Sequence, residues 1–271
     1  VDLGLFQLQP SEVMKIAMVL ALARFYHSLP LEEVGRMRWL VVPAVLILVP
    51  VALVMRQPDL GTAILLLATA TAMLLLAGVR LWKFAVAGGA VLLAIPVAWR
   101  FMLHGYQKDR VLTYLNPERD PLGAGYHIMQ SKIALGSGGL FGKGFMQGTQ
   151  SHLAFLPERQ TDFIFTMLAE EFGLVGCLGL LGLYVLVIAY GYAIAVRSRS
   201  QFGRLLAAGV ISTFFLYVFI NMAMVMGLIP VVGVPLPLVS YGGTSMMSLL
   251  IGFGLVLSVY VHRDVIISRR P

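Results

Sequence analysis

Seven long runs of apolar residues constrain the fold of this chain more than any other feature of its sequence. They lie near residues 13–28, 39–56, 60–79, 84–103, 163–196, 205–227 and 240–262. A helix needs about 20 apolar residues to cross a hydrocarbon core of roughly 30 Å. Hydrophobic residues make up 59% of the 271 residues, against roughly 45–50% in soluble domains. The sequence therefore predicts an all-α integral membrane protein, a polytopic helical bundle with about seven transmembrane helices.

The predicted chain is a single polytopic membrane domain over residues 1–271. Residues 1–103 hold four transmembrane helices, 104–161 form one large extracytoplasmic loop, and 162–271 hold three more helices. The chain begins at Val1 without a methionine or signal peptide, so we expect its natural beginning to lie further upstream.

Basic residues indicate how the helices are oriented. Eleven of the twenty Lys and Arg residues lie in short segments on one side of the predicted bundle: Arg24, Arg36, Arg38, Arg80, Lys83, Arg197, Arg199, Arg204, Arg263, Arg269 and Arg270. The short connections on the other side contain a single basic residue, Arg56. Because basic short loops stay in the cytoplasm, we expect the C-terminus there and the loop 104–161 outside. The net charge of +7 then reflects membrane orientation, and no nucleic-acid partner is expected.

Charged residues are concentrated between residues 152 and 173, beside an apolar run. They are Glu158, Arg159, Asp162, Glu170 and Glu171. An ionised side chain at bilayer depth costs about 2.5–3.5 kcal/mol on insertion scales, so such residues usually face a cavity, a partner or a substrate. Thr161 is predicted to cap the helix, which puts Asp162 in its first turn. On a regular helix Glu170 would lie about 80° around the helix axis from Asp162 and ~12 Å deeper in the membrane. Both carboxylates are therefore expected to face one cavity.

Two further acidic positions are candidates for a site. Glu12 and Lys15 are three residues apart near a predicted helix start, close enough for an ion pair. They are either a helix-dipole carboxylate beside a snorkelling lysine or a charged pair lining a polar cavity. Asp59 lies in a Pro- and Gly-containing turn and is expected to be a solvated turn residue.

The long outer segment is expected to be ordered, because aromatic residues are interspersed with its polar ones. Its glycine-rich stretch 136–144 fails as a phosphate-binding loop, since Ser137 stands where glycine is needed and Gly144 where Ser or Thr is needed. The segment offers basic side chains suited to anionic headgroups or diphosphates: Lys108, Arg110, Arg119, Lys132, Lys143 and Arg159. A plain solvated basic loop is the alternative.

The stretch 228–245 contains three prolines, Pro230, Pro235 and Pro237, which cannot all lie in a regular helix. Non-helical backbone at membrane depth is tolerated only when it is buried in protein or faces water. We therefore predict a partly re-entrant loop that covers the same cavity. Asn221 lies in the preceding span.

Cofactor chemistry based on cysteine or histidine is not expected. Cys177 is the only cysteine, and the five histidines show no metal-ligand spacing.

Several motifs in order resemble the SEDS family (shape, elongation, division and sporulation proteins). The pattern Asn221-x5-Gly227-Leu-x-Pro230, then Gly233 and Ser240-Tyr-Gly-Gly-Thr-Ser245, is similar to its signature. The stretches 9–12, 57–61 and 156–165 match too, so the resemblance covers essentially the whole chain. Residues 120–127, 130–133 and 148–151 resemble the elongation branch more than the division branch. The family has about ten spans, so about three are expected before Val1.

The resemblance implies a peptidoglycan glycosyltransferase in the bacterial cytoplasmic (inner) membrane. Such proteins polymerise the lipid II disaccharide outside the membrane with a class B penicillin-binding protein, beside other elongation-machinery proteins and membrane lipids. The family's essential acidic residue maps onto Asp162, as general base or as ligand of a divalent cation, Mg²⁺ or Mn²⁺, without an organic cofactor. Residues expected to bind substrate are Glu12, Lys15, Asp59, Arg110, Lys132, Glu158 and Arg159.

Two other functions stay open at this point. A transporter that flips lipid II would line a transit path with buried charges and open to both faces. A structural scaffold for a partner enzyme would make Asp162 replaceable.

Overall fold

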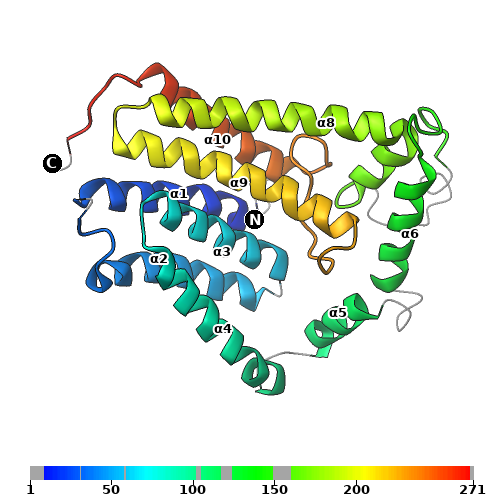
Figure 1. Ribbon diagram of the computed structural model, residues 1–271, viewed down its shortest axis with the longest axis horizontal. Coiled ribbons are helices and arrows are strands. Elements are labelled where there is room, and N and C mark those ends of the chain that lie inside the picture. Colours follow the sequence, from blue (N-terminus) through cyan, green and yellow to red (C-terminus); the bar gives the residue numbers. More distant parts are fainter. Residues whose placement is uncertain are drawn as a thin grey trace. The chain divides into compact units, whose positions relative to one another are not determined.

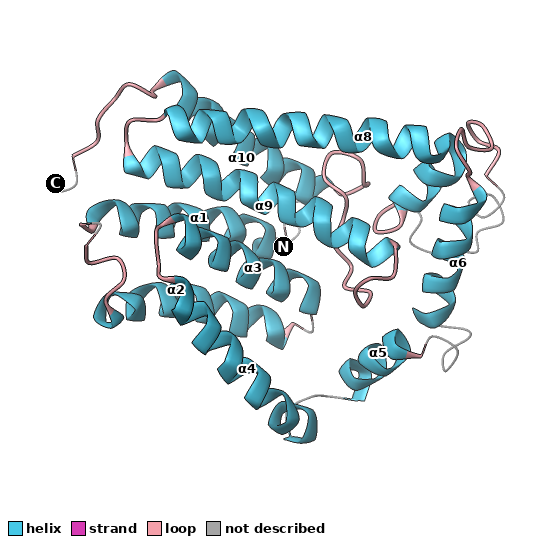
Figure 2. Cartoon of the chain, in the orientation of Figure 1, coloured by secondary structure: helices cyan, strands magenta, loops and turns pink. Residues whose placement is uncertain are grey.

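The computed structural model describes residues 9–30, 32–57, 59–101, 105–116, 124–148 and 160–268. These residues form helices joined by turns and irregular segments, with no strand among them (Figures 1 and 2). The helices are α1 (Pro10–Ser28), α2 (Met37–Arg56), α3 (Leu60–Leu76), α4 (Leu81–Phe101), α5 (Gly105–Leu115), α6 (Ala124–Ser137), α8 (Ile164–Arg197), α9 (Gln201–Val225) and α10 (Gly243–Val261).

Each of the seven apolar runs corresponds to one helix, which confirms the predicted all-α architecture. Within the described residues, α2, α4, α8, α9 and α10 are long and apolar enough to cross a membrane. Helix α3 is apolar but has 17 residues, and α1 carries Glu12, Lys15 and Arg24. The segment 104–161 is ordered where it is described, because it contains α5 and α6.

Helix starts follow local capping chemistry in two places. Pro10 occupies the first turn of α1, where its missing N–H costs nothing. Asp59 is the N-cap of α3, and its carboxylate accepts hydrogen bonds from the Thr62 amide at 3.0 Å and the Thr62 hydroxyl at 2.7 Å. The expectation of a solvated turn residue is therefore wrong for Asp59: the half-buried carboxylate satisfies the end of a helix.

Helix α8 differs from its predicted form at two points. It begins at Ile164, so Asp162 lies in the turn before the helix and not in its first turn. It is also interrupted at Gly173, whose φ of 63° and ψ of −160° are not helical. A regular helix from Asp162 to Glu170 is therefore not what the chain forms, and the angular argument that joined these two carboxylates loses its basis.

The chain divides into two compact units. The first contains α1, α2, α3 and α10, with the end of α8 and most of α9. Its core includes Leu22, Met73 and Phe214, which are fully buried. Gly209 permits close packing there, since a Cβ at this position would lie 2.3 Å from the Met73 sulfur.

The second unit contains α4, α5, α6, the start of α8, the end of α9 and the proline-rich segment before Tyr241. The buried Ser131 joins three of these elements. Its hydroxyl donates to the Val225 carbonyl at 2.8 Å and lies 3.0 Å from the Thr166 hydroxyl. The division differs from the three sequence stretches distinguished above, and the single domain stays a prediction.

Candidate functional site

The turn that carries Asp162 is held by three consecutive backbone carbonyls. The Gln160 carbonyl accepts from the Tyr241 amide at 2.8 Å, and the Thr161 carbonyl accepts from the Ser240 hydroxyl at 2.6 Å. The Asp162 carbonyl accepts from the Asn221 side-chain amide at 2.8 Å. The backbone of this turn is therefore fixed from α9 and from the proline-rich segment at once.

Asn221 bridges the two elements that hold the turn. It is completely buried, and its amide also donates to the Val234 carbonyl at 2.7 Å. The Asp162 carboxylate lies against Gly233, because a Cβ added there would be 3.3 Å from the carboxylate Oδ2. Gly233 also has a φ of 68°, a conformation that favours glycine.

The irregular segment predicted at 228–245 is confirmed as non-helical backbone up to Gly242. It is stabilised internally by Ser240, whose hydroxyl accepts from the Leu236 amide at 2.7 Å while donating to the turn. Its re-entrant position in a membrane stays a prediction. The segment is hydrogen-bonded to the Asp162 turn, and Asp162 is half-buried.

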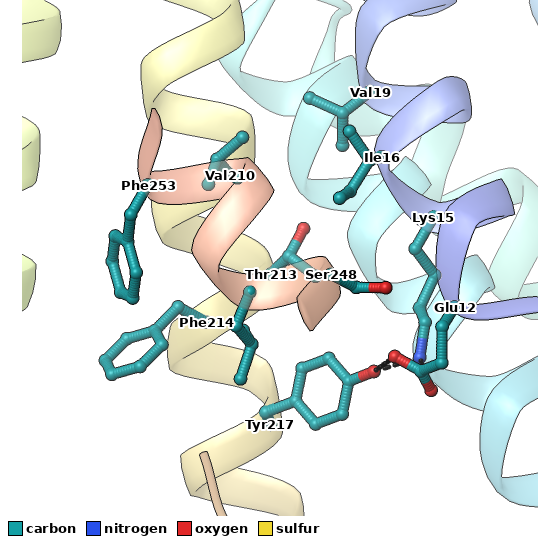
Figure 3. Close-up of a pocket in the computed structure, with 12 residues that line it drawn as sticks. Glu12, Lys15, Ile16, Val19, Val210, Thr213, Phe214, Tyr217, Ser248 and Phe253 are labelled. Atoms are coloured by element: carbon teal, nitrogen blue, oxygen red, sulfur yellow. Dashed lines mark hydrogen bonds and ion pairs between the residues drawn. The ribbon is translucent and has the colours of Figure 1, made fainter. Parts of the chain in front are cut away.

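Glu12 and Lys15 form a buried ion pair in the first unit, where Figure 3 shows them meeting Tyr217 of α9. The Lys15 ammonium is 2.6 Å from Glu12 Oε1 and also donates to the Tyr217 hydroxyl. Tyr217 in turn donates to Glu12 Oε2 at 2.8 Å. Side-chain exposure is 3% for Lys15 and 7% for Glu12. The alternative of a lysine that snorkels to the membrane surface is therefore wrong.

This ion pair lies at one end of a small, partly open pocket of the first unit. Most of the other lining residues are apolar: Ile16, Val19, Val210, Phe214, Leu249, Gly252 and Phe253, with Thr213 and Ser248 as polar exceptions. The charged pair therefore does line a cavity, but one with mainly apolar walls (Figure 3).

Glu170 and Lys143 form a second ion pair, in the same unit as Asp162. The Lys143 ammonium is 2.7 Å from Glu170 Oε1, and the Glu170 side chain is 1% exposed. Lys143 was expected to present its charge to a diphosphate, whereas the structure shows it neutralising a buried carboxylate.

The remaining predicted residues are distributed as follows. Lys132 is an exposed residue of α6, and its side chain lies beside Gly227, where an added Cβ would be 2.4 Å from Lys132 Cε. Arg110 belongs to α5, and its side chain is outside what the structure describes. Glu158 and Arg159 lie outside the described residues altogether.

Sequence reasoning missed Tyr217 and the bonding role of Ser240. Tyr217 is a hydroxyl-bearing residue within a span, which was a weak signal beside so many aromatic residues. Ser240 stands in the family motif, but spacing alone does not say that it bonds Thr161, 79 residues earlier.

The described residues contain no group of three or more His, Cys, Asp or Glu that would hold a metal by itself. Mg²⁺ is commonly held by one or two carboxylates together with substrate phosphates and water. The half-exposed carboxylate of Asp162 fits that smaller role.

The fold and these sites define a multi-pass helical membrane protein with a positioned carboxylate and buried ion pairs. Residues 1–265 match the family model of FtsW, RodA and SpoVE, described as cell cycle proteins. The chain belongs to this family, which confirms the resemblance to the SEDS proteins.

Named relatives support the same placement. The chain is 52% identical over 269 residues to the peptidoglycan glycosyltransferase MrdB of Escherichia coli K12, covering 98% of this chain and 71% of that protein. It is 39% identical over 265 residues to the stage V sporulation protein E of Bacillus subtilis, covering 96% and 70%.

Solved structures agree in fold. A chain of a peptidoglycan synthase complex that coordinates polymerization and crosslinking aligns with a TM-score of 0.82 and 36% identity, covering 97% of this chain and 73% of that chain. The rod shape determining protein RodA of Thermus thermophilus aligns with a TM-score of 0.67 and 31% identity, covering 98% and 69%.

Proposed function

We propose that this chain is a peptidoglycan glycosyltransferase that polymerises lipid II into glycan strands during cell elongation and rod-shape maintenance. The observation that carries the proposal is the Asp162 turn, whose backbone is fixed by three hydrogen bonds while Asp162 itself is only half-buried. A partly accessible acidic residue on a fixed backbone is the arrangement that general-base catalysis requires. The 52% identity to MrdB, itself named a peptidoglycan glycosyltransferase, supports the same activity.

In the proposed reaction Asp162 accepts the proton of the attacking sugar hydroxyl. The hydroxyl oxygen forms the new glycosidic bond to the anomeric carbon of the donor sugar. The bond between that carbon and the lipid diphosphate breaks, and the diphosphate leaves with the electron pair. Because this leaving group is stable as an anion, a second carboxyl acting as general acid, which glycosidases need, is dispensable.

Negative charge on the leaving diphosphate must be balanced. We assign this to Lys132, Arg110 and Arg159, or to a divalent cation, Mg²⁺ or Mn²⁺, which Asp162 would help to hold as a ligand instead of acting as the base. Such a cation would stabilise the departing diphosphate as a Lewis acid. No organic cofactor is included in the proposal.

Glu12 and Lys15 belong to the substrate-binding part of the proposal. The apolar cavity that begins at this pair suits part of a lipid-linked substrate, with the ion pair at its polar end. Asp59 and Glu158 remain candidates for substrate binding, although Asp59 acts in the structure as a helix cap.

We further propose that the chain lies in the bacterial inner membrane with its C-terminus in the cytoplasm and residues 104–161 outside. The distribution of basic residues supports this orientation. The proposed partner is a class B penicillin-binding protein that crosslinks the product, beside other elongation-machinery membrane proteins. The structural likeness to a chain of a peptidoglycan synthase complex supports a partner of this kind.

The test is glycan formation from labelled lipid II by the full-length protein with its class B partner. Asp162→Asn keeps the shape of the side chain but removes the base, so we expect polymer to fall by at least about 100-fold, as for loss of a general base. Asp109→Asn is the matched control, since Asp109 is an exposed carboxylate on α5, and it should keep wild-type activity. Equal polymer from wild type and Asp162→Asn would remove Asp162 from the mechanism.

The same assay separates the other functions. A flippase would move lipid II across vesicles and form no polymer, even as wild type. A scaffold would support polymer formation by its partner regardless of Asp162. Helical content and partner binding are measured for each variant, so that loss of folding is not mistaken for loss of chemistry.

A further inference from the structure

The glycine-rich stretch that failed as a phosphate-binding loop has another role, which begins at the interruption of α8. At Gly173 the helical hydrogen bonding stops, which leaves amides on one side of the break and carbonyls on the other without helical partners. The Leu174 and Val175 amides donate to the Gly139 and Leu140 carbonyls at 3.0 and 3.1 Å. The turn after α6 is thus bonded directly into the break.

The other side of the break is bonded to the same turn. The Lys143 and Gly144 amides donate to the Glu170 and Glu171 carbonyls, both at 3.0 Å. Glycine is required for this approach, because a Cβ at Gly142 would lie 2.1 Å from the Glu171 carbonyl oxygen. Four backbone hydrogen bonds therefore fix the turn at the level of Gly173.

The outer side of this turn is apolar and exposed. Four side chains between residues 139 and 146, hereafter the apolar turn, are largely accessible: Leu140 (63%), Phe141 (79%), Phe145 (70%) and Met146 (61%). The only charged residue between 139 and 146 is Lys143, and its ammonium is directed to the buried Glu170. A contiguous exposed apolar patch of this kind marks contact with a membrane or a protein.

The depth of the apolar turn follows from the helix to which it is bonded. No charged residue occurs in α8 between Gly173 and Arg197, a length greater than the ~20 residues needed to cross the hydrocarbon core. Leu174 and Val175, which bond the turn, are themselves 49% and 55% exposed. Leu174 and Val175 are the first exposed residues of the uncharged part of α8. The turn bonded to them therefore lies at the edge of the hydrocarbon core.

We propose that the apolar turn inserts into the acyl-chain boundary of the bilayer that α8 crosses. The lipid surface is the occupant favoured by two facts: the patch continues the exposed apolar surface of α8, and its one charge is turned away. Insertion of this kind fixes the depth of the helical segment 164–172, because the turn is bonded to Glu170 and Glu171. The Asp162 turn, which precedes that segment, is then held near the level of lipid headgroups.

The test measures depth directly and does not depend on the proposed activity. In the full-length protein with Cys177→Ser, a nitroxide is attached at Phe141→Cys or Phe145→Cys, and the protein is reconstituted in phosphatidylethanolamine–phosphatidylglycerol vesicles. Electron paramagnetic resonance compares collisions with oxygen, which concentrates in lipid, and with a water-soluble nickel chelate. Gln147→Cys is the matched control, because Gln147 is a polar, exposed residue of the same loop.

We expect labels at Phe141 and Phe145 to favour oxygen at least threefold more than the label at Gln147. Equal access to the nickel chelate at all three sites would overturn the proposal, because the turn would then lie in water. Exclusion of both reagents at Phe141 and Phe145 would also overturn it and indicate that protein covers the patch. If these variants do not fold, Leu140→Cys and Met146→Cys report on the same surface.

Discussion

Removing one charge of the buried pair in α1 should destabilise the protein far more than removing both. Lys15→Met leaves the Glu12 carboxylate with only the Tyr217 hydroxyl as a partner, at a site where side-chain exposure is 7% or less. Breaking a buried ion pair in this way costs about 3–5 kcal/mol. Glu12→Gln leaves a buried ammonium and should cost a similar amount.

The double variant Glu12→Gln with Lys15→Met removes both charges and keeps the volume of both side chains. The new glutamine can still accept the Tyr217 hydrogen bond, so stability should return to within about 1 kcal/mol of wild type, because a buried pair replaced as a whole is often neutral. The resulting coupling energy of roughly 5 kcal/mol or more is well above the ~0.5 kcal/mol error of additivity. The assay is denaturant-induced unfolding of the purified full-length protein.

A second ion pair of the same sequence spacing provides the control. Glu33 and Arg36 are also three residues apart, at 3.0 Å, but Arg36 is 56% exposed. Arg36→Met should therefore cost no more than about 1 kcal/mol. Wild-type stability in both single variants at Glu12 and Lys15 would refute the assignment of a buried, charged pair.

The double variant also separates structure from substrate binding. A stable double variant that forms glycan normally would make the pair structural. A stable double variant with a raised KM would place its charges against the substrate.

Three other changes have defined outcomes. Asn221→Leu removes the amide that donates to the Asp162 and Val234 carbonyls, at about 1–3 kcal/mol for each buried hydrogen bond lost. We expect lower stability and a lower kcat for glycan formation, and an unchanged kcat would contradict a role in positioning Asp162. Gly142→Ala forces a Cβ to 2.1 Å from a backbone oxygen and should lower the unfolding midpoint strongly. Gly179→Ala is the control, because a Cβ at that position would have no neighbouring atom within 4 Å. It should leave the midpoint unchanged or raise it slightly through helix propensity. Lys143→Met removes the cation that lies 2.7 Å from the buried Glu170 carboxylate and should destabilise by about 3 kcal/mol. Neutralising Glu170 as well should restore the unfolding midpoint, and failure of this rescue would argue against the ion pair.

Local chemistry accounts for the features that sequence predicted well. The apolar runs form helices of the expected extent. A bilayer core offers no water to the backbone polar groups, so a spanning segment must satisfy them by internal hydrogen bonds. The proline-rich segment is irregular because Pro230, Pro235 and Pro237 cannot donate to a helical ladder. Glu12 and Lys15 pair because residues three apart face the same side of a helix.

The features that sequence missed depend on partners distant in the chain. Asp59 was read as solvated because a turn motif does not show whether its carboxylate will cap the next helix. The sequence predicts that Lys143 is available to an anionic group, but its partner Glu170 lies 27 residues away. No periodicity relates such positions, so only the folded chain decides which buried charge is neutralised by which residue.

The sequence by itself determined that this chain forms membrane-spanning helices and which family it belongs to. Those conclusions rest on hydrophobic length and on motifs, which are properties of contiguous residues. The tertiary structure decided that Asp162 precedes α8, that Asn221 and Ser240 fix its turn, and that a glycine-rich turn completes the interrupted helix. These are decided by contacts across tens of residues, because buried polar groups must find partners wherever the packing provides them.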